Sequence, residues 1–197
     1  MATRIGRTII FENCPHIRHN AAIVGKKEGE GPLAKEFDEV YSDGTLGEDS
    51  WEKAESTLLK KTVEKVIEKS DIEKKDIDCI FAGDLLNQCT GSAFAFSQLP
   101  IPFCGLYGAC STMAEGMLIG SMIVGGGFSD QVVAMTSSHF ASSERQYRFP
   151  LNYGGQRPQT AQWTVTGSGA ALVYGVAALF RIAYGVGHGD WETVSFY

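Results

Sequence analysis

A cysteine set between small residues is the side chain of this sequence best suited to nucleophilic chemistry. Cys110 follows Gly108 and Ala109, after an apolar segment over 103–107 that predicts a short buried strand. An apolar helix is expected to run from Cys110 to about residue 124. A thiol at a helix start faces unpaired backbone N–H groups and the positive end of the helix dipole, which both favour thiolate. The spacing indicates either a nucleophile presented to a pocket or a packed core cysteine.

Three polar side chains follow the buried strand predicted over 77–82: Asp84, Asn87 and Gln88. In an open α/β sheet, ligands bind outside the carboxyl ends of the parallel strands. These side chains therefore either face a pocket at that edge or cap the short helix expected over 90–98.

A histidine and two arginines follow the strand predicted over 131–136. His139 comes just after the end of that strand, so it is expected at the same edge of the sheet as Asp84 and Cys110. It is either a catalytic or binding residue or a hydrogen-bonded surface histidine. Arg145 and Arg148 flank Tyr147. A guanidinium binds a carboxylate through two parallel hydrogen bonds while a neighbouring ring stacks, so the segment suits a planar carboxylate. The alternative is an exposed loop with ordinary surface ion pairs.

The composition is that of an ordinary globular protein. Hydrophobic residues make up 44% and charged residues 20% of the 197 residues, enough for one sizeable core. The formal net charge of −6 argues against nucleic-acid binding. Five cysteines without a C-x-x-C pair indicate free thiols in a reducing compartment. Cys14, His16 and His19 lack the second ligand pair of a structural zinc site, so no metal site is expected.

Neither a signal peptide nor a membrane span is expected. The first residues lack the apolar run of a signal peptide. The most apolar stretch, 113–128, contains Glu115 and five glycines, and it is too short to cross a bilayer. It predicts a buried helix.

The clearest predicted helix spans 49–70. Asp49 and Glu52 have the spacing of a capping box, and apolar residues recur on one face of the helix. Glutamates and lysines alternate along the rest of it, which predicts a solvated face stabilised by pairs three or four residues apart.

The remaining pattern alternates strands with helices. The segment 14–19 reads as a loop, and the charged segment 26–31 reads as a loop or flap. The other predicted strands are 8–11, 21–24 and the end of 164–174. This order predicts an α/β fold with a parallel-centred sheet and helices on both faces.

Several segments in order resemble the stage V sporulation protein AD family, between about residue 8 and residue 174. They are 11–13, 30–33, Asp76–Gln88, Leu106–Thr112, Thr136–His139, Ala141–Pro150, Tyr153–Gln156 and Thr164–Ala170. The resemblance implies a thiolase-like α/β fold, built from two βαβαβαββ halves, of which this chain is the N-terminal one. That half is expected to have a mixed five-stranded sheet with helices on both faces. It implies a domain over 1–175, followed by a divergent or truncated tail over 176–197.

The resemblance also implies a function in sporulation. The family binds dipicolinic acid, a pyridine dicarboxylate, and supports its calcium-linked uptake into the developing spore. It works with other proteins of the same operon, at the cytoplasmic face of the forespore inner membrane or in the cytoplasm. Dipicolinic acid, with or without calcium, is then the ligand, and no cofactor, metal site or nucleic acid is implied. Peripheral membrane association and a homo-oligomer are expected.

The expected site residues lie at the predicted strand ends, in the segments that resemble the family. Cys110 matches the thiolase nucleophile and would line the ligand cavity. The expected ligand-binding residues are Asp84, Asn87, Gln88, Cys110, Ser111, Thr112, His139, Arg145 and Arg148. The alternative function is a thiolase-like or ketoacyl-synthase-like acyltransferase, with Cys110 as nucleophile and His139 as its catalytic partner.

Overall fold

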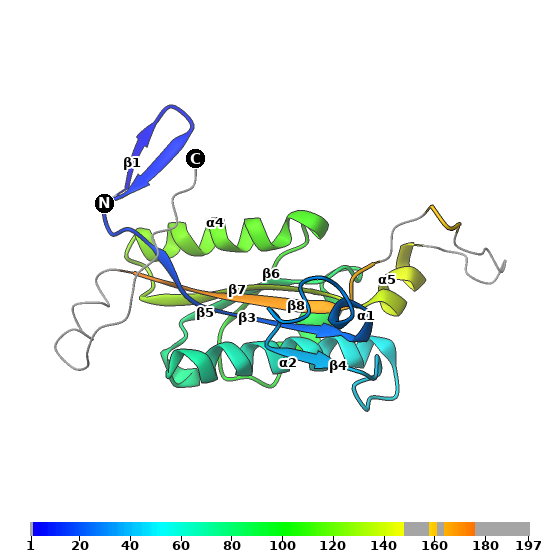
Figure 1. Ribbon diagram of the computed structural model, residues 1–197. Helices are drawn as coiled ribbons and strands as arrows, with labels where there is room; N and C mark the ends of the chain where they lie inside the picture. The colour runs from blue at the N-terminus through cyan, green and yellow to red at the C-terminus, as the bar shows by residue number, and fades with distance from the viewer. Residues whose placement is uncertain (1, 148–157, 161–163, 176–197) are drawn as a thin grey trace.

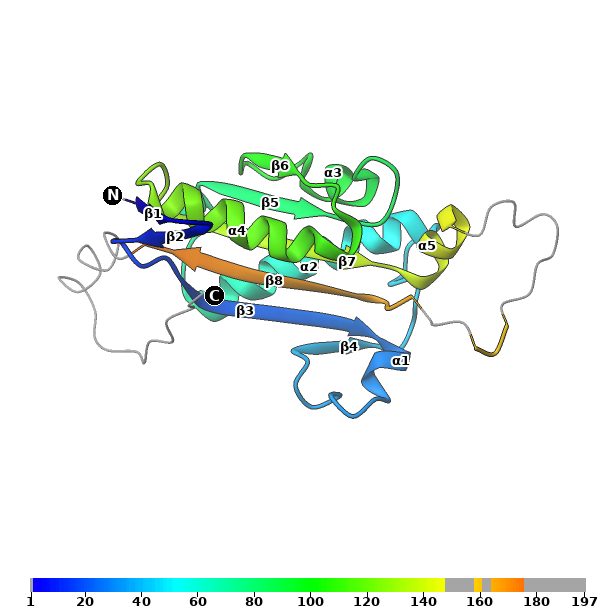
Figure 2. The same ribbon diagram turned by 90° about the horizontal axis from the view of Figure 1, so that it is seen from above.

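A six-stranded mixed sheet forms the centre of the molecule (Figures 1 and 2). The computed structural model describes residues 2–147, 158–160 and 164–175. The strands lie in the order β4-β3-β8-β7-β5-β6, and β8 runs antiparallel to both of its neighbours, whereas the other pairs are parallel. Their bounds are β3 (His16–Gly25), β4 (Glu39–Tyr41), β5 (Cys79–Gly83), β6 (Phe103–Gly105), β7 (Gln131–Ser138) and β8 (Gly167–Tyr174).

Helices cover both faces of this sheet (Figure 1). One face carries α2 (Trp51–Ser70) and α3 (Thr90–Phe96), and the opposite face carries α4 (Thr112–Gly125). The expected α/β class with helices on both faces is therefore confirmed, with six strands in place of five. The other elements are a hairpin of β1 (Ala2–Ile5) and β2 (Thr8–Phe11), the helices α1 (Lys26–Gly29) and α5 (Phe140–Tyr147), and the 3₁₀ turns η1 (Lys74–Asp76) and η2 (Ala109–Ser111).

Helix α2 holds one half of the core. Its Leu59, Val63 and Val66 are fully buried in one cluster with Ile80 of β5 and Leu172 of β8, and burying each such side chain contributes about 1.5–3 kcal/mol. The helix begins one residue later than the capping-box spacing predicted. Ser50 is its N-cap, and the Ser50 hydroxyl accepts a hydrogen bond from the Lys53 N–H at 3.2 Å.

Helix α4 lies close to the other face of the sheet because glycines line its inner side. A Cβ added to Gly120 would lie 2.9 Å from Cγ2 of Val132. Its outer side is open, with Leu118 52% and Met122 44% exposed, so the predicted buried helix is buried on its inner side only. No helix among the described residues is long and apolar enough to cross a bilayer.

Several local predictions need correction. Residues 16–19 are not a loop, because β3 begins at His16 and pairs with β8 along its length. The charged segment after β3 forms the single turn of α1, and the three-residue strand β4 was missed. The segment 103–107 is not a buried central strand, because β6 is short, lies at the sheet edge and leaves Cys104 exposed. The tail over 176–197 lies outside the described residues, so the domain boundary at 175 stays a prediction.

Candidate functional site

The carboxyl ends of the parallel strands share one edge of the sheet, as the sequence predicted. Strands β5, β6 and β7 are parallel neighbours or next neighbours, so residues that follow them lie along a common rim. Asp84 follows β5, Cys110 follows β6 and His139 follows β7. This is the edge at which open α/β sheets bind ligands.

Cys110 is exposed at this rim and lies in η2, two residues before α4 begins. The turn is held locally, because the Ser111 hydroxyl donates to the Gly108 carbonyl at 2.8 Å and the Thr112 hydroxyl accepts from the Gly108 N–H at 3.2 Å. A Cβ at Gly108 would lie 2.6 Å from Oε2 of Glu115 and 2.7 Å from Oγ of Ser111, so a larger residue there would have to displace these two side chains. The result is a thiol presented to solvent by a tight turn at a helix start.

Two tyrosines stand near this thiol. Tyr147 donates its hydroxyl to the Leu85 carbonyl at 3.2 Å, and its ring is 58% exposed. Burial of the hydroxyl raises the pKa of Tyr147, and the neighbouring Tyr107, Cys110 and Asp84 raise it further. The arginines on either side of Tyr147 in the sequence indicated its ring as a stacking surface for a ligand. Tyr107 was not predicted from the sequence as a site residue.

Asp84 is a structural residue of the rim. It is 1% exposed, and its carboxylate accepts from the Leu86, Gly91 and Ser92 N–H groups at 3.1, 3.0 and 2.8 Å. The Ser92 hydroxyl donates to it as well. These contacts tie the start of α3 to the end of β5, which is the capping alternative that the sequence left open.

His139 is buried, and both of its ring nitrogens bind the backbone. Nδ1 accepts from the Ala141 N–H at 3.2 Å, so Nε2 carries the proton and donates to the Gly44 carbonyl at 2.7 Å. The imidazole packs between Trp51 and Phe140, and its burial lowers the pKa of His139. In this conformation the ring offers no free nitrogen to Cys110 or to a ligand, so a catalytic or ligand-binding role for His139 has no support from its geometry.

Two of the predicted ligand residues do line one pocket. Asn87 and Arg145 border a hollow of about 190 Å³ between the ends of α2, α3 and α5. Nη1 of Arg145 donates to Oε1 of Glu52 at 2.7 Å, and the guanidinium is more than half exposed. The full lining is Glu52, Leu86, Asn87, Thr90, Ser142, Arg145 and Gln146. Gln88 is exposed beside it, with its N–H donating to Oδ1 of Asn87 at 3.2 Å, and Arg148 lies outside the described residues.

Glu55 lies in the core of the protein, contrary to the sequence prediction. It was assigned to the solvated face of the 49–70 helix, but it is fully buried. Its carboxylate accepts from the Ser137 hydroxyl at 3.0 Å and from the Ser142 hydroxyl at 2.7 Å. The signal was present in the spacing, because residue 55 lies four positions after Trp51 and three before Leu58, on the apolar side of the helix.

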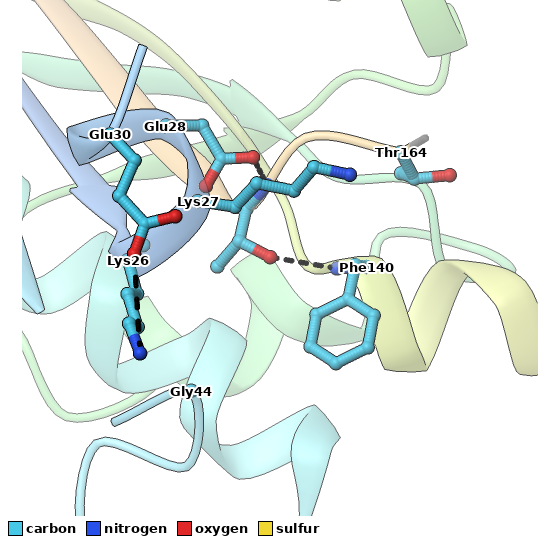
Figure 3. Close-up of a pocket in the computed structure, with 9 residues that line it drawn as sticks. Lys26, Lys27, Glu28, Glu30, Gly44, Phe140 and Thr164 are labelled. Atoms are coloured by element: carbon cyan, nitrogen blue, oxygen red, sulfur yellow. Dashed lines mark hydrogen bonds and ion pairs between the residues drawn. The ribbon is translucent and has the colours of Figure 1, made fainter. Parts of the chain in front are cut away.

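A second and larger hollow lies further along the rim, beyond the end of β3 (Figure 3). Its volume is about 460 Å³, and it is bordered by α1, Gly44, Phe140, and Thr164 and Thr166 just before β8. Oε1 of Glu28 accepts from the Thr166 N–H at 3.2 Å, and Thr166 accepts from the Phe140 N–H at 3.1 Å. These contacts join α1 and α5 through Thr166, just before β8, so the 26–31 segment is anchored as one wall of the hollow.

The part of the chain that the structure describes holds no group of three or more histidine, cysteine or acidic side chains placed to bind a metal ion.

The fold belongs to the thiolase-like class. The 3-oxoacyl-acyl-carrier-protein synthase III of Aquifex aeolicus VF5 aligns with 81% of this chain and 53% of its own chain, at a TM-score of 0.54 and 14% identity. An OleA variant from Xanthomonas campestris aligns with 86% of this chain and 60% of its own, at a TM-score of 0.56 and 14% identity. Each aligned region is a little more than half of the known structure, so this chain has one half of the thiolase-like fold, as the resemblance implied.

Sequence comparison then gives the family. The family model of stage V sporulation protein AD matches residues 6–188. The stage V sporulation protein AD of Bacillus subtilis (strain 168) is 42% identical over 167 residues, which cover 85% of this chain and 49% of that protein. The chain therefore belongs to the stage V sporulation protein AD family of sporulation proteins. It spans about half the length of this curated relative.

Proposed function

We propose that this chain binds dipicolinic acid and supports its calcium-linked uptake into the developing spore. The observation that carries the proposal is the pocket that both Arg145 and Asn87 line, in a chain of the stage V sporulation protein AD family. Dipicolinate is a planar dianion. It needs a cationic fork for a carboxylate, amide or hydroxyl donors, and a flat surface for its ring.

The rim supplies each of these groups. The Arg145 guanidinium carries five N–H donors, of which the Glu52 carboxylate takes one. The Asn87 carboxamide and the Thr90 hydroxyl border the same pocket. The half-exposed ring of Tyr147, two residues after Arg145 and close to Cys110, offers a stacking surface. In this arrangement Arg145 and Asn87 bind one carboxylate, and the ring lies toward Tyr147.

Calorimetric titration of the 197-residue protein with dipicolinate, with and without calcium, tests this proposal. Arg145→Gln is expected to weaken binding by at least about tenfold, since a hydrogen bond to a charged group contributes about 1.5–3 kcal/mol. Lys53→Gln is the matched control, because Lys53 is also an exposed cation, lies in the first turn of α2 and pairs with the Asp49 carboxylate. Equal affinity in the wild type and in Arg145→Gln would refute this site.

A second candidate function is acyl transfer through Cys110. One observation favours it: the exposed Cys110 thiol stands at the start of α4, in a fold shared with 3-oxoacyl-acyl-carrier-protein synthases. Incubation with a labelled acyl thioester should then label the wild type and Cys104→Ser, which keeps Cys110 and removes another exposed thiol. It should not label Cys110→Ser. Absence of an adduct in the wild type would refute acyl transfer.

The exposed outer side of α4 supports a further part of the proposal, that this protein forms a homo-oligomer. Leu118 and Met122 are exposed one turn apart on a helix with a single charged residue, Glu115. We expect a homo-oligomer through this face, working with other proteins of the sporulation operon at the forespore inner membrane. Sedimentation of the wild type and of Leu118→Glu tests the contact, because a charge there should shift the protein toward monomer. An unchanged sedimentation profile would contradict it.

A further inference from the structure

A buried acid lies directly beneath the Arg145 pocket. The Glu55 carboxylate is fully buried and receives hydrogen bonds from two serine hydroxyls. Ser137 is the next-to-last residue of β7, and Ser142 lies in the first turns of α5. Glu55 therefore joins helix α2 to the two elements that lead to Arg145.

The charged groups that face Glu55 are both negative. They are Asp84, from the connection between β5 and α3, and Glu52, one turn earlier on α2. A Cβ built on Gly91 would lie 3.1 Å from Cγ of Asp84 and 3.5 Å from Cγ of Glu55, so the two acidic side chains flank the same glycine. From α5, Arg145 pairs with Glu52, while the neutral His139 before α5 binds Gly44 and Ala141. Ionised Glu55 thus adds a negative charge beside the buried Asp84, near a Glu52 carboxylate that already pairs with Arg145.

The protonated acid fits this site without an unpaired polar atom. The Ser142 hydroxyl lies 2.7 Å from Oε2 of Glu55 and 3.1 Å from the His139 carbonyl. A proton on Oε2 can be donated to Ser142, whose own proton then goes to the His139 carbonyl. Oε1 continues to accept from Ser137. Burial and the neighbouring carboxylates raise the pKa of Glu55 to about 7, which agrees with this hydrogen-bond chain.

Ser142 connects this acid to the ligand, because it lines the pocket with Arg145 and Asn87 and also binds Glu55. We propose that binding of a dicarboxylate in this pocket is coupled to proton uptake by Glu55. The inference rests on the proposed function. Only Ser142 separates a dianion in the pocket from Glu55, so the bound dianion raises the free-energy cost of ionising Glu55. The complex therefore keeps Glu55 protonated, whereas the free protein has partly released that proton at neutral pH.

Proton uptake on binding sets the direction in which affinity changes with pH. Protonated Glu55 is the form that accepts the dianion, so affinity is highest at low pH and falls as pH rises through neutrality. Carboxylates of the ligand titrate near pH 4 and lower, so they stay ionised in this range. Coupling free energies of this kind are about 1–3 kcal/mol, which corresponds to about 5- to 150-fold in affinity.

The test is calorimetric titration of the 197-residue protein with dipicolinate from about pH 6 to about pH 8.5, in buffers of different ionisation enthalpy. The wild type should lose at least about fivefold in affinity across this range and take up a fraction of a proton at neutral pH. Glu55→Gln should bind with an affinity that does not change with pH. Glu68→Gln is the matched control, because it removes an exposed carboxylate from the same helix and should behave as the wild type does.

Each outcome has one meaning. Saturable binding that is independent of pH in the wild type, or an unchanged pH dependence in Glu55→Gln, would overturn the coupling and leave the binding function standing. Absence of saturable binding at every pH would overturn the binding function, and the coupling with it.

Discussion

Glu55→Gln is expected to make the protein more stable at alkaline pH and to remove a step from its stability profile. The carboxylate is fully buried with two hydroxyl donors and with no cation among the groups that face it in the described part of the chain. The glutamine amide has nearly the same shape. Its N–H₂ can donate to Ser142 as the protonated acid does, and its oxygen can accept from Ser137. The substitution therefore mimics the neutral acid at every pH.

The magnitude follows from the pKa of Glu55 in the two states. The folded value is about 7, against an ordinary value of 4.5, so folding binds a proton between these two values. Stability from this group is fully present below pH 4.5 and is lost as pH rises through about 7. The full difference is about 3 kcal/mol, of which about 2 kcal/mol falls between about pH 5.5 and about pH 8. Glu55 is fully buried, so solvent screening does not reduce this figure much.

Urea unfolding of both proteins at about pH 5.5, 7 and 8 measures this step. The difference in the free energy of unfolding, wild type minus Glu55→Gln, should fall by about 2 kcal/mol across this range. Taking the difference cancels the contribution of His139, whose lowered pKa makes the fold less stable as pH falls. A difference that stays constant with pH would refute the assignment of a proton to Glu55.

Three other substitutions test the parts that position the rim, each by urea unfolding at neutral pH. Asp84→Ala should destabilise the protein by about 3 kcal/mol or more, because it leaves the Gly91 and Ser92 N–H groups buried without their acceptor. The control is Asp71→Ala, which removes an exposed carboxylate and should cost far less. Gly120→Val should cost about 1–3 kcal/mol, since even a Cβ would lie 2.9 Å from Val132, and a cost near zero would contradict the close packing of α4. Ser50→Ala should cost about 1 kcal/mol through loss of the N-cap, and Ser50→Asp should restore it.

The fold could be predicted where the signal was local and repeated. The apolar stripe of α2 and the buried runs of β5 and β7 are visible in the sequence because their periodicity follows directly from burial. The alternation of strands and helices then placed Asp84, Cys110 and His139 at one edge of the sheet, which the structure confirms. The family resemblance supplied the half-fold, which periodicity alone does not specify.

The parts that could not be predicted depend on contacts between distant residues. Strand β6 reads as a buried strand, but its place at the sheet edge is set by which strands pair, and Cys104 is exposed as a result. The ring of His139 is held by the Gly44 carbonyl, 95 residues earlier in the chain. No spacing rule reports such a partner. Glu55 is a different case, because its helical position was readable and the error came from treating every glutamate of α2 as solvated.

The residues at the strand ends divide into two sets with different tasks. Asp84 and His139 are buried, and each uses its polar atoms on the backbone of a neighbouring loop or helix. Asn87, Cys110 and Arg145 are exposed, and the side chains of Asn87 and Arg145 contact the neighbouring Gln88 N–H and the Glu52 carboxylate at the pocket. A ligand can be bound by the second set only because the first set fixes the loops that carry it. Substitution of the buried pair should therefore reduce stability and binding together, whereas substitution of Arg145 should reduce binding alone. That contrast separates residues that bind a ligand from residues that only stabilise the fold.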